Sequence, residues 1–100
     1  MKHEQFIELA KKEVASYESI RPDFDINFAE KIDVKDVFIV WSCKTLQNSK
    51  ALLSMPHKGA YYYEFTLNGD KNEVYMDVYE KVMNKALLVD NKTQTKNRGD

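Results

Sequence analysis

The sequence has little of what most catalytic and metal sites require. Cys43 is its one cysteine, which excludes an internal disulfide and a zinc site built from several cysteines. His3 and His57 are its two histidines, and no His, Cys, Asp and Glu cluster has metal-ligand spacing. We therefore predict no metal and expect both rings to be exposed to solvent. With three glycines and no glycine-rich phosphate motif, the sequence also predicts no nucleotide loop and no cofactor.

An excess of charge of either sign and a long apolar run are also missing. Fifteen Lys and Arg against sixteen Asp and Glu give a formal net charge of -1, without the basic field of a typical nucleic-acid-binding domain. No run approaches the roughly 20 apolar residues that span a bilayer. The charged N-terminus lacks the apolar core of an export signal. Together with the single cysteine, these features predict a cytoplasmic protein that does not span a membrane.

What the sequence does contain is enough apolar material for one modest core. Hydrophobic residues make up 43% of the chain and aromatic residues 12%. We predict a single α+β domain over residues 1–89. The polar stretch after it has no periodicity, so we expect a mobile tail over residues 90–100.

The N-terminal region has the pattern of an amphipathic helix. Over residues 3–18, apolar side chains recur every three or four positions, at Phe6, Ile7, Ala10, Val14 and Tyr17. This stripe is too short for a coiled coil, so it is expected to pack on a sheet. Residues 19–35 are predicted to form an irregular connector, with an edge strand there as the alternative.

The middle of the chain alternates strand patterns with turn residues. Residues 37–45 are apolar on both faces, which favours a central strand, and residues 50–55 and 61–67 follow as further strands. After the turn at residues 68–70, a short strand over 73–76 is predicted, then a helix to about residue 88 with Asp77 and Glu80 as a capping box. The predicted fold is an N-terminal amphipathic helix packed on a three- to four-stranded antiparallel meander, with a C-terminal helix.

Two features predict a recognition surface. Trp41, Lys44, Gln47 and Asn48 combine an aromatic ring with cationic and hydrogen-bonding groups near a hairpin end. The competing interpretation, which we favour for this residue, places Trp41 in the core. Tyr62 should face away from its neighbours and, with Tyr75 or Tyr79, form an exposed aromatic patch, unless the C-terminal helix covers that face. The predicted partner-binding residues are Trp41, Lys44, Gln47, Asn48 and Tyr62.

Catalysis and nucleic-acid binding are weaker interpretations. Cys43 and His57 could in principle form a nucleophile and base, but a cysteine inside a strand beside Trp41 is more typical of a small buried hydrophobe, so we predict no enzyme. The order of elements resembles double-stranded-RNA-binding domains, yet Asp77 and Glu80 stand where those domains have lysines. Single-strand binding through aromatic side chains and scattered lysines stays open as an alternative; those lysines are Lys44, Lys50, Lys58 and Lys71.

Two strings in the sequence are similar to those of a family of short uncharacterised proteins encoded by phages and prophages of Firmicutes. They read W-x-C-K-T-L-Q-N-x-K-A-L-L-S and Y-Y-E-x-T-x-N-G-D-K, and the likeness covers roughly residues 34–85. The resemblance implies a small accessory protein made inside a bacterial cell. We therefore expect a non-catalytic protein that binds a bacterial host protein, such as a defence effector or host machinery, as an inhibitor or adaptor. The alternatives are nucleic-acid binding and sequestration of a small nucleotide ligand, and an uncovered sheet face would favour a homodimer.

Overall fold

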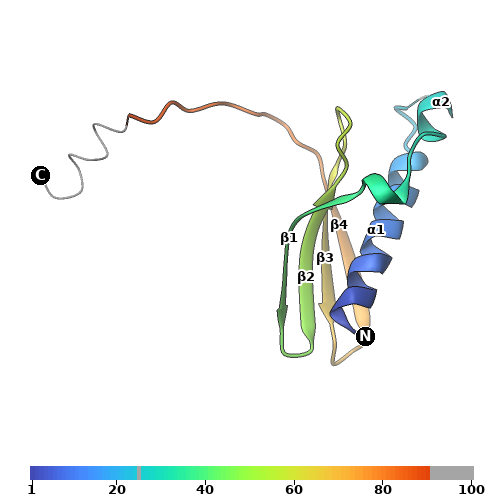
Figure 1. The fold of residues 1–100 in the computed structure, drawn as a ribbon, viewed down its shortest axis with the longest axis vertical. Coiled ribbons are helices and arrows are strands. Elements are labelled where there is room, and N and C mark those ends of the chain that lie inside the picture. Colours follow the sequence, from blue (N-terminus) through green and yellow to red (C-terminus); the bar gives the residue numbers. More distant parts are fainter. Residues whose placement is uncertain (25, 91–100) are drawn as a thin grey trace, which may run out of the picture.

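A computed structural model describes residues 1–24 and 26–90. Along the chain come the helix α1 (His3–Ser19), the short helix α2 (Ile26–Ala29), the 3-10 turn η1 (Val34–Asp36) and the strands β1 (Phe38–Thr45), β2 (Asn48–Ser54), β3 (Tyr62–Asn68) and β4 (Glu73–Tyr79). The strands form one antiparallel sheet in the order β1-β2-β3-β4, and α1 lies along one side of it (Figure 1). The predicted α+β class, with an N-terminal helix on an antiparallel meander, is confirmed.

The core lies between α1 and the inner face of the sheet. One stripe of α1 places Phe6, Ala10 and Val14 out of contact with solvent. Alternate residues of the central strands meet this stripe, because successive strand side chains point to opposite faces. The buried hydrophobic residues of the central strands β2 and β3 are Ala51, Leu53, Tyr63, Phe65 and Leu67.

The first strand is an edge strand rather than the central strand that we predicted. In a meander each strand pairs with the next along the chain, so β1 has one neighbour, β2. All its residues are exposed, and its register with β2 shifts between Ile39 and Trp41. A bulge of this kind is a common protection of an edge strand. The apolar residues on both faces of β1 therefore belong to an exposed edge strand and not to a buried central strand.

The chain after β4 also differs from the prediction. β4 continues to Tyr79, and residues 80–90 are neither helix nor strand, where a helix to about residue 88 was expected. The residues proposed to start that helix are used by the sheet, since Asp77 pairs with Glu64 and Val78 with Tyr63. The stretch that is left is too short to hold an isolated helix without a surface to pack on. Of the predicted tail over residues 90–100, only Asp90 lies within the described residues.

The connector between α1 and β1 is helical where it is regular. It contains α2 and η1, and no strand is found in the described residues of the 19–35 stretch. Asp33 caps η1, because its side chain accepts a hydrogen bond from the Lys35 backbone N–H at 3.0 Å. The connector thus carries the chain from the end of α1 to the outer edge of the sheet.

Candidate functional site

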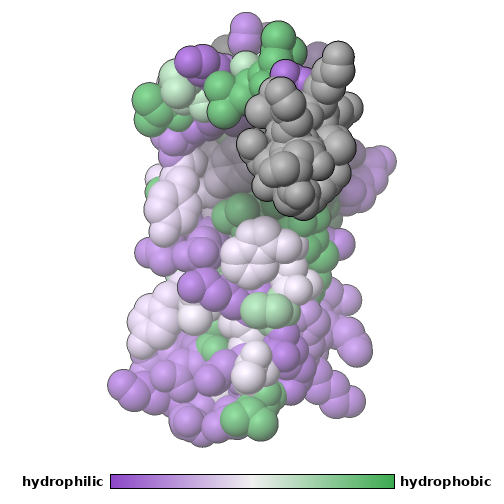
Figure 2. Space-filling view, turned by 90° about the vertical axis from the view of Figure 1, so that its left-hand side faces the viewer, coloured by the Kyte–Doolittle hydropathy of each residue, from purple (hydrophilic) through white to green (hydrophobic). Residues whose placement is uncertain are grey.

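The sheet face opposite α1 carries several aromatic side chains that lie outside the core. Cross-strand partners lie on the same face of a sheet, so the register identifies its members. Tyr62 pairs with Tyr79, and Trp41 pairs with Leu52. We call this surface the open face and define its apolar part as Phe38, Trp41, Leu52, Tyr62, Tyr75 and Tyr79. Figure 2 shows this side of the molecule, where green and pale surfaces run between purple ones.

Charged side chains lie between these rings. Leu52 pairs with Glu64, and Glu64 pairs with Asp77, so two carboxylates cross the middle of the open face. Lys50 lies on the same face, with its Nζ 3.8 Å from Glu64 Oε1. The open face is therefore a mixture of aromatic, aliphatic and acidic groups, with one of its lysines already paired with a carboxylate.

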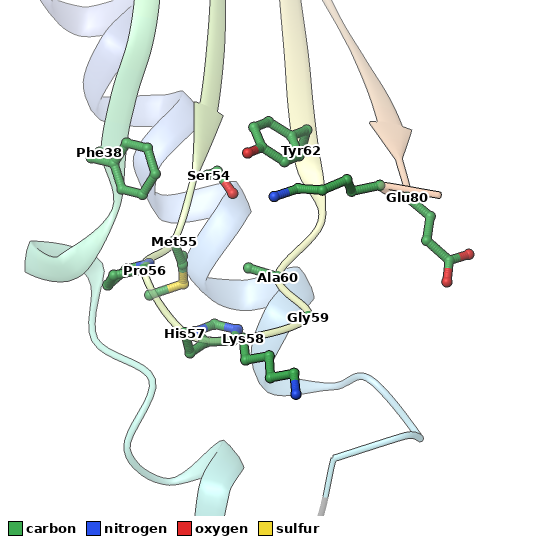
Figure 3. A pocket seen from close by; sticks show the side chains of 11 residues that line it. Phe38, Ser54, Met55, Pro56, His57, Lys58, Gly59, Ala60, Tyr62 and Glu80 are labelled. Atoms are coloured by element: carbon green, nitrogen blue, oxygen red, sulfur yellow. The ribbon is translucent and has the colours of Figure 1, made fainter. Parts of the chain in front are cut away.

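One end of the open face is hollowed. A cavity of about 500 Å³ lies where Phe38, Ser54 and Tyr62 meet the β2–β3 turn and residues 80–81. In Figure 3, Phe38 and Tyr62 lie on either side of Ser54. Lys81 Nζ lies 5.7 Å from the centroid of the Tyr62 ring, within cation–π range. The cavity extends the aromatic surface to the loop between β2 and β3.

The structure brings together two of the predicted partner-binding residues. Trp41 and Tyr62 both lie on the open face, and Trp41 is 40% exposed. The favoured placement of Trp41 in the core is wrong, because Trp41 lies on an edge strand and α1 packs on the other face of the sheet. Tyr75 and Tyr79 extend the same patch, as the patch interpretation of Tyr62 predicted.

The other three predicted residues serve the hairpin rather than the open face. Lys44 pairs with Ser49, on the α1 side, and its Nζ donates to the Leu46 carbonyl. Gln47 Nε2 donates to Asp70 Oδ1 at 2.5 Å, and Asn48 Oδ1 accepts from the Gly69 N–H at 3.0 Å. Gln47 and Asn48 thus tie the β1–β2 turn to the β3–β4 turn.

A buried carboxylate that the sequence analysis missed anchors the opposite end of the sheet. Glu18, at the end of α1, has no exposed surface. Its Oε1 lies 2.6 Å from His57 Nε2, and its Oε2 accepts from the Tyr63 hydroxyl at 2.5 Å and from the Tyr61 N–H at 3.3 Å. Arg21 Nη1 donates to both carboxylate oxygens, at 3.2 and 3.0 Å. A buried charge is tolerated when it is paired and hydrogen-bonded in this way.

Arg21 is held as tightly as the carboxylate. Its guanidinium carbon lies 3.6 Å from the centroid of the Tyr61 ring and 4.2 Å from that of Phe24. Burial opposes its charge, but hydrogen bonds to Asp23 and Glu18 outweigh burial and raise the pKa of Arg21 above its ordinary value. The hydrogen bond from Arg21 in turn lowers the pKa of Asp23.

This cluster positions the β2–β3 turn that lines the cavity. Arg21 Nη1 also donates to the Gly59 carbonyl at 2.8 Å, and His57 packs against the rings of Phe24 and Phe28. The expectation that His57 lies free in solvent is wrong, and so is that for His3, whose Nδ1 lies 3.0 Å from Ser49 Oγ. One signal could have revealed the cluster: Glu18 continues the series of positions 6, 10 and 14, so it is the acidic member of an apolar stripe.

The remaining candidate chemistry is dispersed. Cys43 is exposed on the open face, not buried as we expected, and it pairs with Lys50 near the β1–β2 turn, whereas His57 follows the opposite end of β2. Within residues 1–24 and 26–90, no group of three or more His, Cys, Asp or Glu is placed to hold a metal ion. No helix in the same residues is long and apolar enough to cross a membrane.

Comparison with known proteins gives a family and no function. The family described as "Family of unknown function (DUF6275)" matches residues 7–89. No curated protein and no solved structure matches the chain. The matched range begins within α1, includes the whole sheet and ends near the end of the described residues.

Proposed function

The chain belongs to this family of unknown function, DUF6275, and we propose that it is a non-catalytic accessory protein that binds a bacterial host protein through the open face. The observation that carries the proposal is a sheet with one face packed under a helix, while no helix or strand of the described residues covers the aromatic side chains of the other face. Phe38, Trp41, Tyr75 and Tyr79 are each between 40% and 50% exposed.

The composition of the open face suits a protein partner. Aromatic side chains supply most hot spots of protein interfaces, because they bury a large area while losing few rotamers. Monomeric proteins rarely leave a large contiguous apolar patch in water unless it has a binding role. Trp41 and Tyr79 stand on the two edge strands, β1 and β4, so a partner lying across the sheet would contact both.

The charges of the open face support a protein over a nucleic acid. Glu64 and Asp77 lie between the aromatic rings and would repel phosphates. The lysines named for phosphate binding are spread over both ends and both faces of the sheet, since Lys58 follows β2 and Lys71 lies in the β3–β4 turn. Lys50 is already paired with Glu64.

The inference that the partner is a protein of a bacterial host rests on the resemblance to phage and prophage proteins. An accessory protein of that kind works by stoichiometric binding, which needs a surface and no reaction centre. The buried Glu18 cluster fits this view, because its groups are used to hold the β2–β3 turn.

Affinity capture from a Firmicute lysate tests the proposal. The tagged protein, treated with nuclease, should retain a bacterial protein that the variant with Trp41→Ala and Tyr79→Ala fails to retain. The matched control carries Lys12→Ala and Glu13→Ala, two exposed positions on α1, and should capture as the unmodified protein does. Equal capture by both variants, with unchanged circular dichroism, would exclude the open face. Loss of all capture on nuclease treatment would favour nucleic acid instead.

A further inference from the structure

The strand β4 stands at one side of the sheet and has an unpaired edge, which we call the β4 edge. β4 pairs with β3, and on its other side no backbone hydrogen bond joins it to a residue that the structure describes. Alternate residues of an outer strand direct their backbone N–H and C=O groups away from the sheet. Over Glu73–Tyr79 these groups form a row at strand spacing, which is the arrangement that another extended chain pairs with.

The two outer strands of the sheet differ in how well they resist pairing. On β1 the register shift between Ile39 and Trp41 interrupts the row, and Lys44 adds a cation; both features discourage the addition of a strand. β4 has neither feature, because all seven of its residues pair with β3 in an unbroken register and none of them is lysine, proline or glycine. The β4 edge can therefore take up a further strand along its whole length.

The charges on β4 indicate which kind of strand fits. Glu73 and Asp77 are the charged residues of β4, and both are exposed. They lie on the open face, four residues and about 13 Å apart along the strand. Neither forms an ion pair with a lysine or arginine of the described residues. Tyr75 lies between them on the same face, and its hydroxyl donates to Glu73.

A second copy of this chain does not supply the matching strand from its own β4. Pairing the two β4 strands would bring four carboxylates and no cation to one face, and like charges on neighbouring strands destabilise the pair. Lys or Arg on the added strand would instead form cross-strand ion pairs with Glu73 and Asp77. On the other face Val74, Met76 and Val78 are partly buried against the core, so apolar side chains of the added strand would continue that contact.

We propose that the β4 edge accepts an extended strand of the bound host protein. This strand carries Lys or Arg four residues apart on one face and apolar residues on the other. The backbone of β4 supplies the hydrogen bonds, while Glu73 and Asp77 select the cationic strand over an acidic one. The inference rests on the proposed function, because it specifies which part of the host protein extends the sheet beside the open face.

A synthetic peptide tests the β4 edge without a host protein. The capped peptide Thr-Lys-Val-Thr-Val-Lys-Thr has its two lysines four residues apart on one face and its valines on the other. Added at up to millimolar concentration to ¹⁵N-labelled protein, it should shift the amide signals of residues 73–79 and leave those of β1 in place. The same peptide with Glu for both Lys should bind at least tenfold more weakly. Unchanged β4 signals, or equal binding of the two peptides, would overturn the proposal.

Charge reversal on β4 tests the selection. Glu73→Lys with Asp77→Lys should invert the preference, so that the Glu peptide binds more tightly than the Lys peptide. The matched control is Glu8→Lys with Glu13→Lys, which changes the net charge equally at exposed positions of α1. This control should keep the preference of the unmodified protein. Inversion in the control as well would show that the net charge of the chain, and not β4, selects the peptide.

Backbone methylation of the peptide tests strand pairing itself. A strand added to an edge uses the N–H of every second residue. Of two Lys peptides, one N-methylated at its even residues and one at its odd residues, one should lose binding and the other should keep it. The same affinity for both methylated peptides would mean that side chains alone make the contact, which would overturn the added strand.

The two proposals fail separately. Capture of a host protein that depends on Trp41 and Tyr79, without peptide binding at β4, supports the proposed function and overturns the added strand. Selective binding of the Lys peptide at the β4 edge supports the added strand, even where those substitutions leave capture unchanged and the open face is excluded.

Discussion

At the scale of single residues, Glu18 decides how the end of α1 meets the sheet. A carboxylate without exposed surface would be costly alone, but it is paired with Arg21 and hydrogen-bonded by His57 and Tyr63. No described buried side-chain nitrogen or oxygen lacks a hydrogen-bond partner. The cost of removing one member is therefore larger than that of losing one hydrogen bond, because the others are left buried without their partner.

We predict that Glu18→Gln lowers the free energy of unfolding by about 3 kcal/mol, as expected when one partner of a buried ion pair is removed. Arg21 then lacks its buried counter-charge, and one amide group must replace two acceptor oxygens. Urea denaturation followed by circular dichroism measures the change. Glu13→Gln removes an exposed carboxylate from the same helix and should change stability by less than about 0.5 kcal/mol. Equal effects of the two substitutions would show that the cluster is not a stabilising unit.

The buried hydroxyl of Tyr63 leads us to predict that the fold loses stability at alkaline pH. Burial first, and then the hydrogen bond to Glu18, raise the pKa of Tyr63 above its ordinary value of about 10. A group with a raised pKa in the folded state contributes stability below its unfolded pKa and loses it as pH rises. The free energy of unfolding should therefore fall above about pH 10, and Tyr63→Phe should make this fall shallower.

The control variant for Tyr63→Phe is Tyr75→Phe. The hydroxyl of Tyr75 is exposed, and its pKa is raised by the hydrogen bond to Glu73. This variant should flatten the alkaline fall less than Tyr63→Phe does. Chemical denaturation between pH 8 and pH 11 gives both slopes, and a steeper or unchanged slope for Tyr63→Phe would contradict the account.

At the scale of elements, two turns meet at one end of the sheet and fix its hairpins together. Gly69 lies so close to the β1–β2 turn that an added Cβ would stand 2.1 Å from the Gln47 carbonyl oxygen. That contact is with backbone, so a flexible side chain cannot relieve it. The hydrogen bonds from Gln47 to Asp70 and from Gly69 to Asn48 cross the same gap.

We predict that Gly69→Ala lowers the free energy of unfolding by about 1 to 3 kcal/mol, the usual cost of overpacking a close contact. Thermal denaturation measures the change, which should appear as a lower melting temperature. Lys71→Ala, an exposed position in the same turn, should have little effect. A fully stable Gly69→Ala variant would mean that the two turns lie farther apart than described.

The elements also show how far the sequence predicts the fold. The helix of residues 3–18 and the alternation at residues 61–67 were predictable, because both are half buried and burial imposes a clear period. The position of β1 at the edge was not, since apolar residues on both faces indicate a central strand as readily as an exposed edge strand. Glu18 was missed because its partners His57 and Tyr63 are distant in sequence. The spacing of helix residues shows which side of α1 Glu18 faces, but it does not show which residues pair with its carboxylate.

At the scale of the whole molecule, the helix and the open face divide the chain into a packed side and an open side. The core under α1 contains the fully buried side chains, and the open face carries aromatic side chains that are partly exposed. The sequence predicted that Trp41 or Tyr62 could serve recognition, but only the register shows that they share a face with Tyr75 and Tyr79.

This division predicts that substitutions on the open face weaken partner binding and leave the protein folded. Trp41→Ala with Tyr79→Ala should weaken binding of a captured host protein at least tenfold, because truncation of an aromatic hot spot costs more than about 1.4 kcal/mol of binding free energy. The same variant should lose only about 2 kcal/mol of stability and stay folded, since both side chains are about half buried. Titration calorimetry and denaturation measure the two quantities on one preparation.

The most direct test of the proposed binding through the open face uses Trp41, the single tryptophan of the sequence. Its indole N–H gives one signal in a ¹⁵N-labelled sample, which can be followed as the unlabelled captured protein is added. The account predicts that this signal shifts or broadens in proportion to the complex formed, while the amide signals of Lys12 and Glu13 on the exposed side of α1 keep their positions. An unchanged indole signal, together with shifts confined to α1, would contradict binding through the open face.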